Sequence, residues 1–240
     1  MGVISMEQVK KKVEEKYSIA RSNCIIEKNA IIKEFAAISN NIPNYDAEKM
    51  DFGTYNKDNF VAFFADMRSS TPRALQIGPA KTFLTIHAIM PAMIYIVESY
   101  KGYVIDLPGD GVMALFKDND SIYWGENKSN YLKPEELAVV CGQEMLKAFD
   151  IVVNPILAED DIPPVTFGVG IDTGSVIVTK TGTDNTFDTK AIGSCINNAS
   201  KKANGEKEIA ISRDTYNKIS TTLKSKFSLG TDNWYIQKIG

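Results

Sequence analysis

The stretch Gly102-Tyr-Val-Ile-Asp-Leu-Pro-Gly-Asp-Gly-Val-Met-Ala-Leu-Phe116 decides the fold of this chain. Apolar residues stand on both sides of its tight turn, Pro108-Gly109-Asp110-Gly111, and a Gly-Asp-Gly turn between apolar runs predicts a β-hairpin. Aspartate is common in turns for conformational reasons alone. Asp110 therefore indicates chemistry only if a second feature of the sequence points to the same place.

That second feature is Asp66, which ends the apolar run Phe60-Val-Ala-Phe-Phe-Ala-Asp66. The run predicts a buried strand, and Arg68-Ser69-Ser70-Thr71-Pro72 after it predicts a helix start with Pro in the first turn. Two acids at the ends of neighbouring strands, beside the free N–H groups of a helix start, are what a metal–triphosphate site requires. The structural alternatives are a helix cap for Asp66 and a turn residue for Asp110.

Composition narrows the class of protein. The 240 residues are 44% hydrophobic and 24% charged, with a net charge of -3. These values are typical of a soluble globular domain with one core plus an extension. They indicate no nucleic-acid partner, and no uninterrupted apolar run approaches the ~20 residues of a membrane span. Three unclustered cysteines, Cys24, Cys141 and Cys195, favour a cytoplasmic location without disulfides or zinc.

The rest of the chain predicts helices and strands in the order of an α+β, ferredoxin-like fold, with an antiparallel-rich sheet and flanking helices. A long N-terminal helix is expected over 6–39, and a hairpin turning at Asp172-Thr173-Gly174 is expected to be followed by a polar loop over 181–189. The other expected helices end at Gly78, run from Pro79 to Tyr100, span 134–157 and follow Gly193, and further strands are expected over 208–211 and 234–239.

Five motifs in this order resemble those of class III nucleotidyl cyclases. They cover 63–71, 109–116, 167–174, 192–200 and 211–216, and the resemblance extends over roughly residues 57–240. It implies an N-terminal helical extension over 1–44 and a cyclase catalytic domain over 45–240. Within the class, Asp66-Met67-Arg68-Ser-Ser-Thr and Lys81-Thr-Phe-Leu-Thr-Ile-His87 are most similar to the pyrimidine cyclases of Pycsar antiphage systems.

The resemblance implies that the ribose 3′-oxygen of a nucleoside triphosphate attacks the α-phosphate. Two divalent ions, Mg²⁺ or Mn²⁺, about 3.5–4 Å apart, assist such a displacement. Asp66 and Asp110, with the Met67 carbonyl, would hold them. The N–H groups of Ser69, Ser70 and Thr71 would take the β- and γ-phosphates.

By the same resemblance, Asn197 would orient the ribose or the α-phosphate, and Lys201 stands where the family usually has Arg. Lysine keeps the charge but loses the planar fork of arginine. A second family arginine is replaced by Gly168, and Arg68 would compensate by reaching a phosphate. The alternative for Arg68 is an ion pair that steadies the loop, and the alternative for Lys201 is a solvated helix charge. Lys238 would match a late phosphate-binding lysine.

Asp106 and Lys190 occupy the base-recognition positions in the reverse of the adenine pattern. A carboxylate only accepts and an ammonium only donates, and each of the four bases offers a matching edge, so hydrogen-bond type alone selects none. The alternative is that the two side chains pair with each other. The departure from both purine patterns favours UTP or CTP.

We therefore expect a pyrimidine cyclase that makes cyclic UMP or cyclic CMP and pyrophosphate, as a second messenger for a separate effector protein in antiviral defence. The family implies a homodimer in which metal ligands from one protomer face base-binding and asparagine residues from the other. Two alternatives stay open: a guanylate or adenylate cyclase with an unusual base pocket, and a non-catalytic nucleotide-binding dimerisation module.

Overall fold

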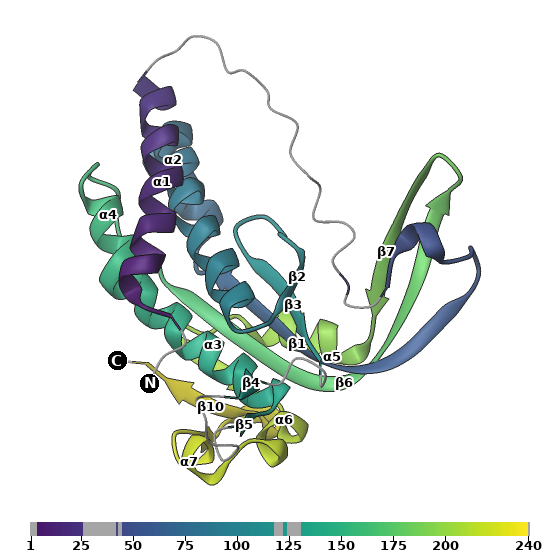
Figure 1. Cartoon of the computed structure of the whole chain (residues 1–240). Coiled ribbons are helices and arrows are strands. Elements are labelled where there is room, and N and C mark those ends of the chain that lie inside the picture. Colours follow the sequence, from purple (N-terminus) through teal and green to yellow (C-terminus); the bar gives the residue numbers. More distant parts are fainter. Residues whose placement is uncertain (1–3, 26–41, 43–44, 118–121, 124–130, 240) are drawn as a thin grey trace.

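The computed structural model describes residues 4–25, 42, 45–117, 122–123 and 131–239. Its main sheet has the strand order β2-β3-β1-β6-β8-β10-β9, and β7 pairs with β6 beside this path (Figure 1). Only β6 and β8 (Glu208–Ile211) pair in parallel, and the other neighbours are antiparallel. The predicted α+β fold with an antiparallel-rich sheet is confirmed.

The central strands place the two acids next to each other. β1 (Tyr55–Met67) pairs with β3 (Val112–Phe116) as far as Ala65 opposite Val112. β2 (Tyr103–Asp106) pairs with the other edge of β3, so the predicted hairpin is confirmed. The turn of the hairpin therefore lies beside the end of β1, where Asp66 follows the last paired residue, Ala65.

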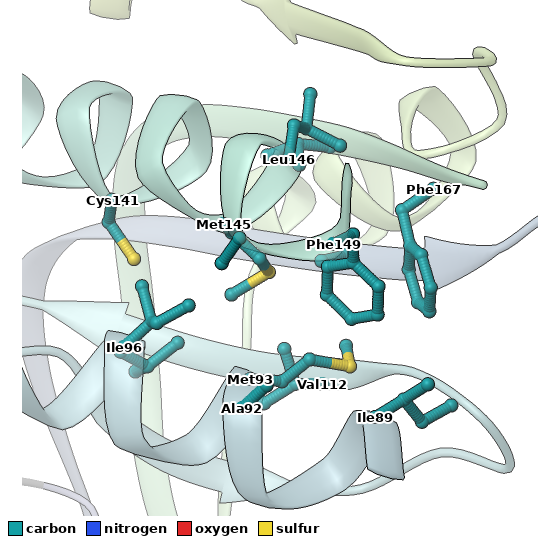
Figure 2. Packing of buried hydrophobic residues seen from close by; sticks show 14 of the residues in the cluster. Ile89, Ala92, Met93, Ile96, Val112, Cys141, Met145, Leu146, Phe149 and Phe167 are labelled. Atoms are coloured by element: carbon teal, nitrogen blue, oxygen red, sulfur yellow. The ribbon is translucent and has the colours of Figure 1, made fainter. Parts of the chain in front are cut away.

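The larger hydrophobic core lies between one face of the sheet and the helices α1 (Met6–Ile25), α2 (Ser70–Ser99) and α3 (Pro134–Ala148). Figure 2 shows its centre, where Met93 and Ile96 of α2 meet Met145 of α3. A π-helical turn, Phe149–Val153, joins α3 to α4 (Asn154–Ala158). The predicted break at Gly78 is confirmed, because this residue has φ 78° and ψ 172° inside α2.

A smaller core lies on the opposite face, under α5 (Ser194–Lys202). Cys195, Ile196 and Ala199 of this helix pack against Phe60, Phe64 and other side chains of the central strands. Each face of the sheet is thus covered by a different set of helices, and α5 is the α-helix that covers the smaller core among the described helices.

The remaining elements are α6 (Arg213–Lys218), α7 (Thr221–Lys224), β4 (Ile122–Tyr123), β5 (Tyr131–Leu132), β9 (Ser228–Leu229), β10 (Tyr235–Lys238) and the short 3-10 helices Ala47–Lys49 and Thr231–Asn233.

Two sequence predictions are wrong in this region. The expected hairpin at 172–174 does not form, because β6 runs unbroken from Phe167 to Thr183 and pairs with β1 along its length, from Tyr55 opposite Thr179 to Met67 opposite Phe167. The expected loop over 181–189 is largely strand, since β7 (Thr186–Ile192) folds back on β6. Figure 1 shows this β6–β7 arm projecting beyond the body of the domain.

The N-terminal helix packs on the main body. Val9, Val13 and Tyr17 are buried in the larger core, and the Tyr17 hydroxyl donates to Asp160 at 2.8 Å, beside an Arg21–Asp160 ion pair at 2.9 Å. The predicted helical residues 26–39 lie outside the described part of the chain.

Helix α2 is long and apolar enough to cross a membrane by length and composition alone. In this fold, however, 44% of its most apolar window is buried inside the domain. Its length therefore serves the core that Figure 2 shows.

Val13→Ala should show how much the N-terminal helix contributes to the stability of the whole chain. The change removes two methyl-sized groups from a side chain that is fully buried, so we expect a loss of about 2 kcal/mol in the free energy of unfolding. Denaturant unfolding of the full chain measures this, with Lys11→Ala on the exposed face of the same helix as the control. Equal stabilities for both variants would mean that α1 is not part of the cooperative unit.

Candidate active site

The hairpin turn touches the end of β1 through a glycine. A Cβ added at Gly111 would lie 2.8 Å from the Ala65 carbonyl oxygen and 3.0 Å from Asp66 Oδ1, so no other residue fits without displacing the strand. Gly109 has φ 62°, a left-handed conformation that glycine adopts without strain. The two glycines thus let the turn close tightly and hold Asp110 beside Asp66.

Both carboxylates are shifted toward protonation. Burial raises the pKa of Asp66, and the charge of Asp110 raises it further. Burial also raises the pKa of Asp110, against the opposing effects of its own backbone N–H, the Ser70 hydroxyl and Arg68. Asp110 Oδ2 is buried and has no hydrogen-bond partner. A buried carboxylate oxygen without a partner is costly, and a cation between the two acids would remove this cost.

The donor set fits a hard divalent cation. Two carboxylates and a backbone carbonyl suit Mg²⁺ or Mn²⁺, and they leave positions for phosphate oxygens. Within the described residues there is no group of three or more His, Cys, Asp or Glu side chains, so a fully protein-ligated metal cage is absent there. The site has the composition expected when the substrate supplies part of the coordination.

The start of α2 lies beside the acids. Ser69 is its N-cap residue, in a left-handed conformation with φ 55°, and Ser70 and Thr71 open the first turn. In the described chain these three N–H groups have no protein acceptor, and Pro72 has no N–H to offer. The predicted helix start is therefore confirmed, and its binding of the β- and γ-phosphates stays a prediction.

Two arginines flank this helix start. Arg68 lies 3.7 Å from Asp66 Oδ2, the ion pair that was the structural alternative for this residue. Arg73 donates to the carbonyl oxygens of Pro163 and Pro164, at 3.0 Å for Pro164. Arg73 thus fastens the first turn of α2 to the segment that leads into β6, whereas the Arg68 guanidinium makes only the ion pair with Asp66 among the described residues.

Asn197 and Lys201 lie one helical turn apart on α5 and are both exposed. Among the described residues, neither makes a hydrogen bond or an ion pair with Asp66 or Asp110. At Gly168 a Cβ would lie 2.3 Å from the Gly205 carbonyl oxygen. No side chain fits at that position, so the family arginine missing there is excluded by backbone packing. Lys238 is exposed in β10, opposite Glu208, and its role stays a prediction.

The side chains at the two base-recognition positions, Asp106 and Lys190, do not pair with each other. Lys190 Nζ donates to Asp188 Oδ2 at 2.6 Å, so the alternative of a direct Asp106–Lys190 pair is wrong. The Asp188 hydrogen bond raises the pKa of Lys190, and the charge of Asp106 adds to this increase. Asp106 is exposed and accepts from the Leu107 N–H. Asp188 was missed because 181–189 was expected to be a loop, although residues two apart on a strand share a face.

No protein-family model matches the chain. Among curated proteins, an adenylate cyclase of Anabaena cylindrica is 23% identical over 154 residues, which is 64% of this chain and 28% of that protein. A cytidylate cyclase of Escherichia coli is 25% identical over 114 residues, which is 48% of this chain and 24% of that protein. The chain therefore spans about a quarter of the length of these two relatives.

Solved structures decide the fold. The adenylyl cyclase CyaB of Pseudomonas aeruginosa superposes with a TM-score of 0.59 and 23% identity, over 76% of this chain and 94% of that one. A class III adenylyl cyclase-like ATP-binding protein from the same species gives 0.61 and 17%, over 92% and 46%. This chain has the fold of a class III nucleotidyl cyclase domain. The resemblance read from the five motifs is confirmed.

Asp110→Asn should separate metal binding from stability. It removes one of two neighbouring half-buried charges, so the metal-free variant should melt higher than the wild type at pH 7. It should also lose the stabilisation by Mn²⁺, which for the wild type reaches about 2.7 kcal/mol at a hundredfold excess over Kd. Thermal melts with and without Mn²⁺ measure both effects, with Asp106→Asn as the exposed control.

The pH dependence of the metal-free wild type has a definite sign. Burial raises the folded pKa of Asp66 and Asp110 above the ordinary value of 3.8, so the folded state binds more protons between the two values. The free energy of unfolding of the metal-free protein should therefore rise as pH falls through the folded pKa values toward 3.8.

In the melts of Asp110→Asn described above, an unchanged stabilisation by Mn²⁺ would contradict the assignment of Asp110 as a metal ligand.

Proposed function

We propose that this domain is a pyrimidine nucleotide cyclase that converts UTP or CTP into the 3′,5′-cyclic monophosphate and pyrophosphate. The observation that carries the proposal is the convergence of Asp66 and the unpartnered Asp110 carboxylate oxygen beside the free N–H groups of α2. Positive helix-end charge and carboxylate-held cations are together suited to a triphosphate.

In the reaction, the ribose 3′-oxygen forms a bond to the α-phosphorus, the bond to the β-phosphate oxygen breaks, and the 3′-hydroxyl proton leaves to solvent. The N–H groups of Ser69, Ser70 and Thr71 hold the departing β- and γ-phosphates, and Arg68 supplies a further positive charge. Two divalent cations held by Asp66, Asp110 and the Met67 carbonyl would lower the pKa of the 3′-hydroxyl and neutralise the leaving group. Asn197 and Lys201 orient the ribose and the α-phosphate.

We propose that the two halves of the site come from two protomers. Asn197 and Lys201 are exposed on α5 and, among the described residues, form no hydrogen bond or ion pair with the two acids. The β6–β7 arm and the neighbouring start of β1 expose large apolar side chains, as the faces of a dimer do. These side chains are Tyr55, Ile177, Phe187 and Ile192.

The base pocket and the name of one relative favour a pyrimidine. The Escherichia coli relative is named as a cytidylate cyclase. Lys190, held by Asp188, offers N–H donors, and the exposed Asp106 carboxylate offers an acceptor. Uracil, with N3–H beside a carbonyl, and cytosine, with an amino group beside a bare ring nitrogen, both satisfy such a pair. The wider role that we propose is that of a cytoplasmic source of second messenger for a separate effector protein in antiviral defence.

One observation favours a second candidate, a non-catalytic nucleotide-binding module. A solved neighbour of the same fold is named as an adenylyl cyclase-like ATP-binding protein. This chain also lacks room for an arginine at Gly168 and carries Lys201 in place of another. Such a module would bind nucleotide without releasing pyrophosphate.

Product analysis tests the proposal directly. Pure protein with Mn²⁺ and ATP, GTP, CTP or UTP should yield a cyclic pyrimidine nucleotide, identified by mass spectrometry. Asp66→Ala or Asp110→Ala should each lower turnover by at least about 10²-fold, because a metal ligand is lost. A cyclic purine product would contradict the pyrimidine assignment. Nucleotide binding without any pyrophosphate would favour the non-catalytic module.

Mixing variants tests the composite site. Asp66→Ala and Asn197→Ala are each expected to be inactive alone. In mixed dimers, one site combines an intact acid pair with an intact asparagine, so the mixture should recover part of the activity. Asp66→Ala mixed with Asp110→Ala is the matched control, because both changes fall in the same half-site and no complete site forms. Full-length dimers without recovery in the first mixture would show that each protomer uses its own residues.

A further inference from the structure

The backbone of helix α5 lies directly against the backbone of strand β6. Gly168, Gly170, Asp172 and Gly174 alternate along this face of β6, with Gly168 under Ala203 and Gly205, which follow α5, and the other three under the helix itself. A Cβ at Gly170 would lie 2.0 Å from the Ala199 carbonyl oxygen, and one at Gly174 would lie 3.0 Å from Cys195 Cβ. Cys195, Ile196 and Ala199 of α5 pack against side chains of the central strands, among them Phe60 and Val176. Of the β6 residues directly under α5, Gly170, Asp172 and Gly174, only Asp172 has a side chain that can hold the helix.

Asp172 is a buried carboxylate that accepts a hydrogen bond from helix α5. Only 7% of the residue is exposed. Asn198 Nδ2 of α5 donates to Asp172 Oδ2 at 3.0 Å. Burial raises the pKa of Asp172, and hydrogen bonds from the side chains of Ser212 and Asn198 oppose this change. In the described chain no lysine or arginine pairs with this carboxylate, so hydrogen bonds alone compensate its burial.

Ser212, at the start of α6, belongs to a cluster of hydrogen-bonded hydroxyl groups. Ser212 caps α6 by accepting from the Thr215 N–H at 3.2 Å, and its own N–H donates to the Ile171 carbonyl at 3.0 Å. Thr215 Oγ1 lies 2.8 Å from Thr173 Oγ1 and 3.1 Å from Ser212 Oγ. The strand residue that follows Asp172, Thr173, is thus hydrogen-bonded to this cluster, and Asn198 supplies the hydrogen bond between Asp172 and α5.

We propose that the Asp172–Asn198 hydrogen bond is a positioning pair that sets the rotation of α5 and thereby aims Asn197 and Lys201 into the site. Consecutive helical residues are separated by about 100° around the axis. Asn198 is exposed like Asn197, but its amide is bonded to Asp172, so this bond fixes the direction in which the neighbouring Asn197 points. This inference rests on the proposed cyclase function, because it assigns Asn197 a role in the reaction. A displacement of about 1 Å of such a group is enough to cost up to about 10²-fold in rate.

An exchange of the two groups tests the pair. Asn198→Asp places a second carboxylate on Asp172 and should lower kcat at least about tenfold, while the KM for the nucleotide stays within about twofold. The double variant Asp172→Asn with Asn198→Asp restores one donor and one acceptor, so kcat should recover. Asn217→Asp, an exposed helical asparagine on α6, is the charge-matched control. Melting temperatures are compared so that every assay is run on folded protein.

Hydrogen exchange supplies a readout that is independent of catalysis. Amides of 194–202 should exchange faster in Asn198→Asp and return to wild-type rates in the double variant. The proposal is overturned if Asn198→Asp keeps wild-type kcat, or if the double variant stays as slow as the single one. A wild type without cyclase activity would refute the proposed function instead, and recovery of exchange protection alone would then decide whether the pair positions α5.

Discussion

The contact between Gly111 and the end of β1 is the constraint on which the candidate site depends. At this point the turn of the β2–β3 hairpin lies against the Ala65 carbonyl and Asp66, with no space for a side chain. Asp110 is held next to Asp66 as a consequence, and the pKa of both acids rises. Two neighbouring half-buried carboxylates are unfavourable without a positive charge between them, and this supports our proposal that the site binds cations.

A second close contact organises the other half of the site. Glycines at 170 and 174 let α5 lie directly on β6, and the larger core on the opposite face holds β6 in place. The two halves therefore use the same central pair of strands: β1 ends at the acids, and β6 carries the helix with Asn197. Rigid strands are a better support for such groups than loops would be.

Much of the fold could be predicted from the sequence, for reasons that are local. The apolar run before Asp66, the Gly-Asp-Gly turn and the Ser-Ser-Thr-Pro helix start are each formed by neighbouring residues, and the structure contains all three. The prediction that Asp66 and Asp110 are neighbours followed from two such local signals, the end of the strand before Asp66 and the turn that contains Asp110.

The errors arose where pairing between distant residues overrides local composition. Asp172-Thr173-Gly174 is a typical turn sequence, but thirteen consecutive residues of β1, Tyr55–Met67, pair with β6 and keep it extended. The polar stretch of β7 shows no hydrophobic alternation because the arm is outside the core. Asp188 and the Asp172–Asn198 pair were missed for this reason, since both depend on strands that composition did not reveal.

The central claim is that Asp66 and Asp110 together bind the cations that a nucleoside triphosphate needs. An anomalous difference map from crystals grown with Mn²⁺ and a non-hydrolysable UTP analogue tests it most directly. The account predicts manganese peaks within coordination distance of both carboxylates, with the β- and γ-phosphates at the start of α2. Manganese bound elsewhere, or a triphosphate that does not contact Ser69, Ser70 and Thr71, would contradict it.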